Sequence, residues 1–174
     1  MKKYIKSAIT PYWDEPKEVL RELARDPHTR QDTLKSLAEH PDPIVRFLVL
    51  TNPAAAEWAY QKSTLTDLDI DDDIRLGIDL YYAGSAYGGT NPEVLKTICK
   101  NVAAKSGAIL NDSIYVHNLD ASDWCNEETG FDGENCVYVE IRFRYPHGYE
   151  YIVEDQAIKD LEAVGCEVLS TDYY

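Results

Sequence analysis

The segment 120–136, DASDWCNEETGFDGENC, concentrates side chains that could do chemistry. Its carboxylates are Asp120, Asp123, Glu127, Glu128, Asp132 and Glu134. The segment contains no basic residue, and Trp124 and Phe131 add two large aromatic side chains. Carboxylates at this density could bind a divalent cation or a basic protein surface, and an aromatic residue on a loop can anchor a partner. A solvated hairpin excursion, with Trp124 folded back on a sheet, is the alternative that stays open.

A second acidic run, DLDIDDD at 67–73, contains five aspartates in seven positions. A calcium-binding EF-hand loop requires glycine at its sixth position and glutamate at its twelfth. Counted from Asp67, these positions hold Asp72 and Ile78, so the tight turn and the bidentate ligand are both missing. We expect the run to be the start of a helix, where acids cap free N–H groups. An exposed partner-binding patch with Asp67 and Asp69 is the alternative.

The histidines and cysteines offer ligand types for zinc, but their spacing argues against a common site. If 137–145 is an extended strand, Cys136 and His147 lie on the order of 30 Å apart, at ~3.3 Å per residue. His117 with Cys125 is the one pair suited to nucleophilic catalysis, and the acids around Cys125 disfavour its thiolate. The sequence therefore predicts no metal, no cofactor and no catalytic residue. Whether Cys125 and Cys136 pair as a disulfide stays open.

The overall charge restricts the class of partner. The 174 residues have a net charge of −14, from 31 acidic and 17 basic side chains, and residues 91–174 hold 16 of the acids against 6 basic residues. Such a field repels phosphates, which disfavours direct binding to nucleic acid and favours a protein with a basic surface. No apolar run reaches the ~18 residues of a membrane span, and the N-terminal apolar stretch is too short for a signal peptide. We expect a cytoplasmic protein.

The first half of the chain contains an internal repeat. VLRELARDP (19–27) is echoed by TLKSLAEHP (33–41), and DPIVRFLVLTNP (42–53) is echoed by DDIRLGIDLYYA (72–83). Leucines three apart followed by alanine form the apolar stripe of a short helix, which the proline then ends. Short helices bury such stripes only by stacking, so an α-helical repeat stack is predicted over 12–83. The residues expected on its inner faces are Leu23, Leu37, Val45 and Val49.

The stretch LAEHPDPIVRFLVLTNPAA (37–55) resembles the leucine-rich repeat variant family, whose units contain Leu-Ala, Asp-Pro, Val-Arg and Asn-Pro in this order. The resemblance covers about residues 16–83, and the last unit lacks the Asn-Pro element. It implies a curved stack of short helices, similar in style to HEAT repeats, and it implies no single activity. An iron–sulfur version of the family depends on a cysteine cluster. Residues 1–98 contain no cysteine, so that cofactor is not implied.

The second half follows a different pattern, after a Gly- and Ser-rich linker at 82–91. A helix is predicted at 91–107, strands at 113–119 and 137–145, a helix at 154–165 and a strand at 166–170. In 137–145 apolar and polar residues alternate strictly, as expected for a strand with one buried face. The chain is thus predicted to be an α+β protein. Its second domain, 91–174, should have the order α-β-β-α-β, with an antiparallel sheet and helices on one face.

These features predict a non-enzymatic protein that binds a partner with a basic surface, such as a nucleic-acid-binding protein whose site the acidic chain would occupy. Acidic inhibitors from phages and mobile elements, including anti-CRISPR proteins, are comparable in charge and size and not in any motif. The expected partner-binding residues are Asp67, Asp69, Asp123, Trp124, Glu127, Glu128, Phe131, Asp132 and Glu134. Two alternatives remain: a divalent-metal-dependent hydrolase or nuclease that uses the acids of 120–134, and a structural component of a larger assembly.

Overall fold

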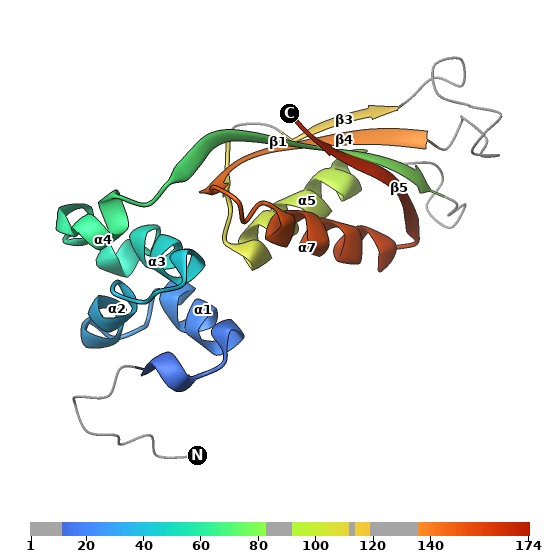
Figure 1. The fold of residues 1–174 in the computed structure, drawn as a ribbon. Helices are drawn as coiled ribbons and strands as arrows, with labels where there is room; N and C mark the ends of the chain where they lie inside the picture. Colours follow the sequence, from blue (N-terminus) through green and yellow to red (C-terminus); the bar gives the residue numbers. More distant parts are fainter. Residues whose placement is uncertain (1–11, 83–91, 112–113, 119–135) are drawn as a thin grey trace, which may run out of the picture. The chain divides into compact units, whose positions relative to one another are not determined.

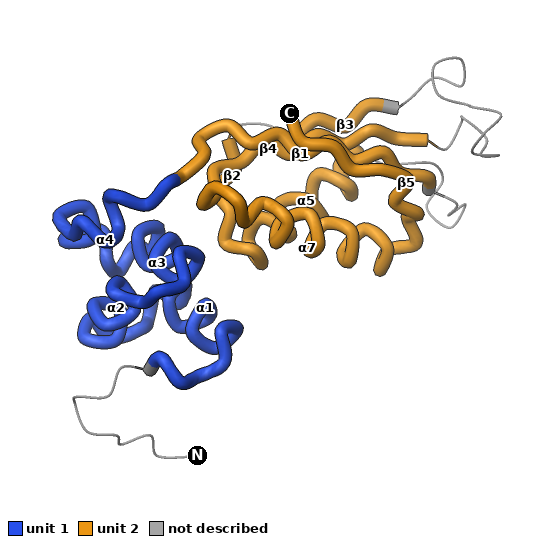
Figure 2. Tube along the Cα trace, in the orientation of Figure 1, with its two compact units in different colours: residues 1–69 blue, residues 70–174 orange. Residues whose placement is uncertain are grey.

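The computed structural model describes residues 12–82, 92–111, 114–118 and 136–174 (Figure 1). The chain forms two compact units, residues 1–69 and residues 70–174, which are coloured separately in Figure 2. We describe each unit by itself and call them unit 1 and unit 2.

Unit 1 is built from short helices. These are α1 (Lys17–Arg25), α2 (Gln31–Leu37), α3 (Pro43–Leu50) and α4 (Ser63–Thr66), with the 3-10 turns η1 (Tyr12–Asp14), η2 (Pro53–Ala55) and η3 (Ala59–Gln61). The predicted inner residues Leu37, Val45 and Val49 are fully buried, whereas Leu23 is only half-buried. The burial prediction is therefore correct for three of the four side chains and wrong for Leu23, and both the repeat stack and membership of the repeat family stay predictions.

Asp42-Pro43 starts α3, and Asn52-Pro53 starts the turn η2. The Asp42 carboxylate accepts a hydrogen bond from the Ile44 N–H at 2.9 Å, and a proline follows each capping residue at the first helical position. The buried Asn52 side chain donates to the carbonyls of Ala24, at 2.8 Å, and of Asp26, at 3.0 Å. Asn52 thus joins the end of α1 to the start of η2, so these motif residues serve the fold and not a ligand.

In its described residues, unit 2 consists of a five-stranded antiparallel sheet and two helices. The strands are β1 (Ile70–Tyr82), β2 (Ile109–Leu110), β3 (Tyr115–Asn118), β4 (Cys136–Pro146) and β5 (Cys166–Tyr173), and the helices are α5 (Pro92–Ser106) and α7 (Tyr151–Glu162). The strand order is β2-β4-β1-β5, and β3 also pairs with β4. The two helices lie on the same face of the sheet (Figure 1). The predicted α+β class, with an antiparallel sheet and helices on one face, is confirmed.

The connections of unit 2 follow a split β-α-β pattern. Because β1 and β3 are both antiparallel to β4, the connection through α5 joins parallel strands that have β4 between them. The connection through α7 likewise joins β4 to β5, with β1 between them. With β2 and β3 counted as one edge, the order along the chain is β-α-β-β-α-β. The face opposite the helices is covered by no described element of this unit (Figure 1).

The apolar core of unit 2 lies between the sheet and its helices. Alternate residues of the two central strands are fully buried, among them Leu76, Ile78, Val139 and Ile141. The buried Tyr145 hydroxyl donates to the Ser106 carbonyl at 2.8 Å, which fixes the end of α5 to β4. Cys99 and Cys166 are buried, as expected from their places in a helix and a strand.

The prediction of a third repeat helix at 72–83 is wrong, because residues 70–82 form strand β1. Its buried residues Ile74, Leu76, Ile78 and Leu80 recur at every second position, which is a strand period. Ile74 and Ile78 are four positions apart, so this pair also fits the spacing of a helix. This explains why the segment resembled a repeat helix. The acids at 71–73 consequently belong to the strand and cap no helix. The segment 70–82 joins unit 2, so the boundary falls after Asp69 and not at 82–91.

Candidate functional site

The charge of the chain is concentrated in unit 2. With the boundary at Ile70, unit 2 holds 20 acidic and 7 basic side chains, a net charge of −13, and unit 1 holds 11 acidic and 10 basic side chains, a net charge of −1. The four aspartates of β1 contribute to this difference in charge between the units, because β1 belongs to unit 2. A candidate site for a basic partner is therefore sought on unit 2.

Most of the positive charge of unit 2 is engaged within the unit. Five of its seven basic residues pair with acids of the same unit: Arg75 with Asp73 at 3.1 Å, Lys96 with Glu93 at 3.1 Å, Lys105 with Asp160 at 2.6 Å, Arg142 with Glu140 at 2.6 Å, and Arg144 with Asp72 at 2.7 Å. The pairs among these that are exposed, such as Arg75 with Asp73, add little stability. Because most of the basic side chains are paired, the electrostatic field around unit 2 comes mainly from the acidic side chains in excess.

The predicted acidic loop lies between β3 and β4. Its residues Asp123, Trp124, Glu127, Glu128, Phe131, Asp132 and Glu134 lie outside the described residues, and their role stays a prediction. The strands on either side are described, and Asn118 is the Cα partner of Val137. The described residues on either side of 119–135 therefore lie on neighbouring strands.

The two other predicted binding residues, Asp67 and Asp69, belong to unit 1 and are exposed. Asp67 follows α4 and lines a hollow of about 310 Å³; the other lining residues are Glu39, His40, Pro41, Arg46, Ser63 and Thr64. Arg46 donates to the carbonyl of His40 at 2.6 Å and to that of Pro41 at 2.9 Å. Its guanidinium thus supports the turn before α3. Burial lowers the pKa of His40.

The open face of the sheet carries a row of aromatic side chains that the sequence analysis did not single out. Tyr115 and His117 of β3 stack at a ring-centroid distance of 6.4 Å, and His117 stacks on Tyr138 of β4 at 6.3 Å. The Arg142 guanidinium lies 5.0 Å from the centre of the Tyr115 ring. The signal was present in the polar positions of 137–145, which alternate with the buried ones and include a tyrosine and two arginines.

Gly77 of β1 makes room for this aromatic row. A Cβ atom at this position would lie 2.7 Å from the Tyr138 hydroxyl and 3.1 Å from the Tyr174 ring. Burial, followed by the nearby negative charge of Glu140, raises the pKa of Tyr138 to about 12. Tyr138 is neutral near pH 7, as tyrosines ordinarily are, and offers an aromatic surface with a polar end, which suits a protein interface.

No protein-family model, curated protein or solved structure matches the chain. Among the described helices, none is both long and apolar enough to cross a lipid bilayer.

Proposed function

We propose that this chain is a non-enzymatic protein-binding module, and that its unit 2 binds a basic surface of a partner protein. The observation that carries the proposal is that unit 2 holds −13 of the net charge of −14. A field of this sign attracts a basic protein over long distances and accelerates its association. The same field repels the phosphates of nucleic acids.

The partner that fits this field best is a protein that itself binds nucleic acid. Such a protein presents clustered lysines and arginines to a phosphate backbone, and these side chains are equally complementary to closely spaced carboxylates. An acidic module bound there would compete with nucleic acid for one surface. The proposed activity is therefore inhibition by occupation of the site.

The binding residues divide into two roles. The carboxylates of the 119–135 segment, Glu127 and Glu128 among them, attract the partner and set the rate of association. Trp124 acts as the desolvated anchor and sets the rate of dissociation. The aromatic row of Tyr115, His117 and Tyr138 lies on the strands that flank this segment, so it extends the contact surface beyond the loop.

The test begins with the full-length chain as bait in an extract of its source organism. Binding kinetics with the captured protein are then measured at two ionic strengths. Association should slow steeply with salt, since exposed charges are screened within ~10 Å at 0.1 M. The double variant Glu127→Lys/Glu128→Lys should lower the association rate, and Trp124→Ala should speed dissociation.

A matched control separates a site from net charge alone. Glu18 and Glu22 are exposed on α1, so Glu18→Lys/Glu22→Lys changes the total charge by the same amount in unit 1. This control should associate like the parent chain. Equal slowing by both double variants would show that only total charge matters, and parent-like binding by the loop variants would exclude the loop as the interface.

The inhibitory part of the proposal has its own measurement. A labelled nucleic acid bound to the captured partner should be released as the full-length chain is added. Simultaneous binding of the chain and the nucleic acid would show that the chain occupies another surface of the partner.

A further inference from the structure

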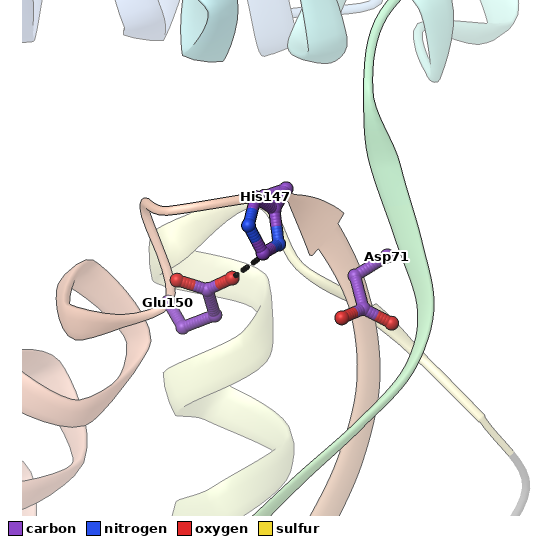
Figure 3. Close-up of side chains that lie close together, drawn as sticks. All are labelled: Asp71, His147 and Glu150. Carbon is purple, nitrogen blue, oxygen red and sulfur yellow. Dashed lines mark ion pairs between the residues drawn. The ribbon is translucent and has the colours of Figure 1, made fainter.

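Three side chains at one end of the unit 2 sheet converge although they come from separate parts of the chain. Asp71 lies at the start of β1, His147 follows the end of β4, and Glu150 precedes α7. One potential ligand atom from each lies within 4.8 Å of the other two, as Figure 3 shows. His147 and Glu150 are closest, with 3.7 Å between Nδ1 and Oε1.

The backbone around these residues holds them in place. Asp71 is the register partner of Tyr145, so the pairing of β1 with β4 brings it beside the turn that contains His147. Gly148 has a φ of 80°, a left-handed conformation that lets this turn reverse, and its N–H donates to Glu150 Oε1 at 2.8 Å. The Asp73 N–H donates to Asp71 Oδ1 at 3.2 Å. A backbone donor thus orients each carboxylate, as outer-shell contacts do around metal ligands.

The ligand types indicate which cation would fit. Two carboxylates with a neutral imidazole carry a charge of −2, which complements a divalent ion. Magnesium and calcium favour sites made entirely of oxygen atoms, whereas an imidazole nitrogen suits zinc and its neighbours in the first transition row. The histidine therefore favours zinc over the alkaline-earth ions.

We propose that Asp71, His147 and Glu150 form a three-ligand Zn²⁺ site whose fourth position is open to water. Two ligand atoms around a tetrahedral zinc lie roughly 3.3 Å apart, given bonds of ~2.0 Å. Shortening a spacing of 4.8 Å, the upper limit among these atoms, to this value requires side-chain movements of at most about 1.5 Å. Asp71 is exposed and the His147 side chain is 67% exposed, so both can move this far. This site goes beyond the protein-binding function proposed above and does not depend on it.

The first experiment titrates the metal-free full-length chain with Zn²⁺ against a chromophoric chelator and follows thermal unfolding. One saturable site and a rise in melting temperature are expected. His147→Ala and Asp71→Asn should each weaken binding by ~10-fold or more and abolish the rise, as expected when a ligand is removed. The matched controls are His28→Ala and Asp32→Asn, which alter exposed residues of the same types outside the cluster. Both controls should bind like the parent.

A second readout distinguishes this site from one that uses cysteine. Co²⁺ replaces Zn²⁺ in this measurement because its absorption spectrum reports its ligands. Co²⁺ bound to one nitrogen and carboxylate oxygens shows no thiolate-to-metal charge-transfer band, whereas a site with Cys125 or Cys136 would show one. The expected spectrum lacks this band and is lost in His147→Ala. The proposal is overturned if zinc does not bind at one equivalent, if His147→Ala and Asp71→Asn bind like the parent, if the thiolate band appears, or if Mg²⁺ stabilises the chain as well as Zn²⁺ does.

Discussion

Unit 1 buries its apolar side chains between helices that follow one another in the chain, whereas unit 2 buries them under strands that are distant in sequence. Leu37 and Val45 pack within one run of neighbouring helices. In unit 2, Asp79 of β1 meets Ser170 of β5, and these two residues are 91 positions apart. The core of unit 1 thus depends on contacts between neighbouring segments of the chain, and the core of unit 2 depends on contacts between distant ones.

The same two units differ in charge, −1 against −13, although each has a well-packed core. Charge of this size does not help a domain to fold, because like charges repel in the compact state. The sheet tolerates the acids because they occupy outward positions, such as that of Asp79 between the buried Ile78 and Leu80. The excess of acids in unit 2 therefore does not serve stability, and it is consistent with the partner binding proposed above.

The largest expected effect comes from truncating one core residue in each unit. Leu37→Ala and Ile78→Ala each delete a fully buried side chain and should lower the free energy of unfolding by about 2–5 kcal/mol. Calorimetry of the full-length chain should show each variant lowering a different transition. One shared transition, lowered by both variants, would show that the two units unfold as a single cooperative body.

Asn52→Ala should have the next largest effect and act on unit 1. It removes a helix cap and leaves the carbonyls of Ala24 and Asp26 without the Asn52 donor, at a cost of about 1–3 kcal/mol. Denaturant unfolding measures the change. The control Gln61→Ala alters an exposed side chain and should stay within about 0.5 kcal/mol of the parent. If Asn52→Ala lowers the free energy of unfolding by less than about 0.5 kcal/mol, the Asn-Pro pair does not have this structural role.

Two arginine variants sharpen the contrast further. Arg46→Lys removes a guanidinium that donates to two backbone carbonyls in unit 1 and should cost about 0.5–1.5 kcal/mol. Arg75→Lys in unit 2 alters an exposed pair with Asp73 and should cost at most about 1 kcal/mol. Melting temperatures compare the two directly. A larger loss in Arg75→Lys would mean that ion pairs of the sheet face stabilise unit 2 more than their exposure implies.

The smallest effect is a pH dependence confined to unit 2. Because the pKa of Tyr138 is raised from 10.0 to about 12 in the folded chain, its contribution to stability is complete below pH 10 and is lost as the pH rises towards 12. Tyr138→Phe cannot ionise at this position, so its melting temperature should fall less over this interval. Melting curves at intervals from pH 9 to 12 test this. Parallel curves for the two proteins would show that Tyr138 ionises as readily in the folded chain as in the unfolded one.

Much of the fold could be predicted because its signals are local. The strict alternation in 137–145 indicates a strand, and the leucine spacing around Leu37 indicates a short buried helix. The strand β1 was missed because Ile74 and Ile78 fit both periods, and the partners that decide between them lie far away in the sequence. The Asp71, His147 and Glu150 cluster was missed for the same reason, because only the register of β1 with β4 brings these residues together.

The position of β1 in the sheet also has a consequence for synthesis of the chain. This central strand emerges from the ribosome well before either of its neighbours, β4 and β5. Ser170, the hydrogen-bond partner of Asp79, is synthesised 91 residues later. At ~5–20 residues per second, the delay is on the order of 5–20 s. During this time its apolar row has no sheet to join, while unit 1 can already fold. The aspartates at 71–73 and Asp79 place charges along the exposed strand, and charges in such positions protect a nascent strand from aggregation.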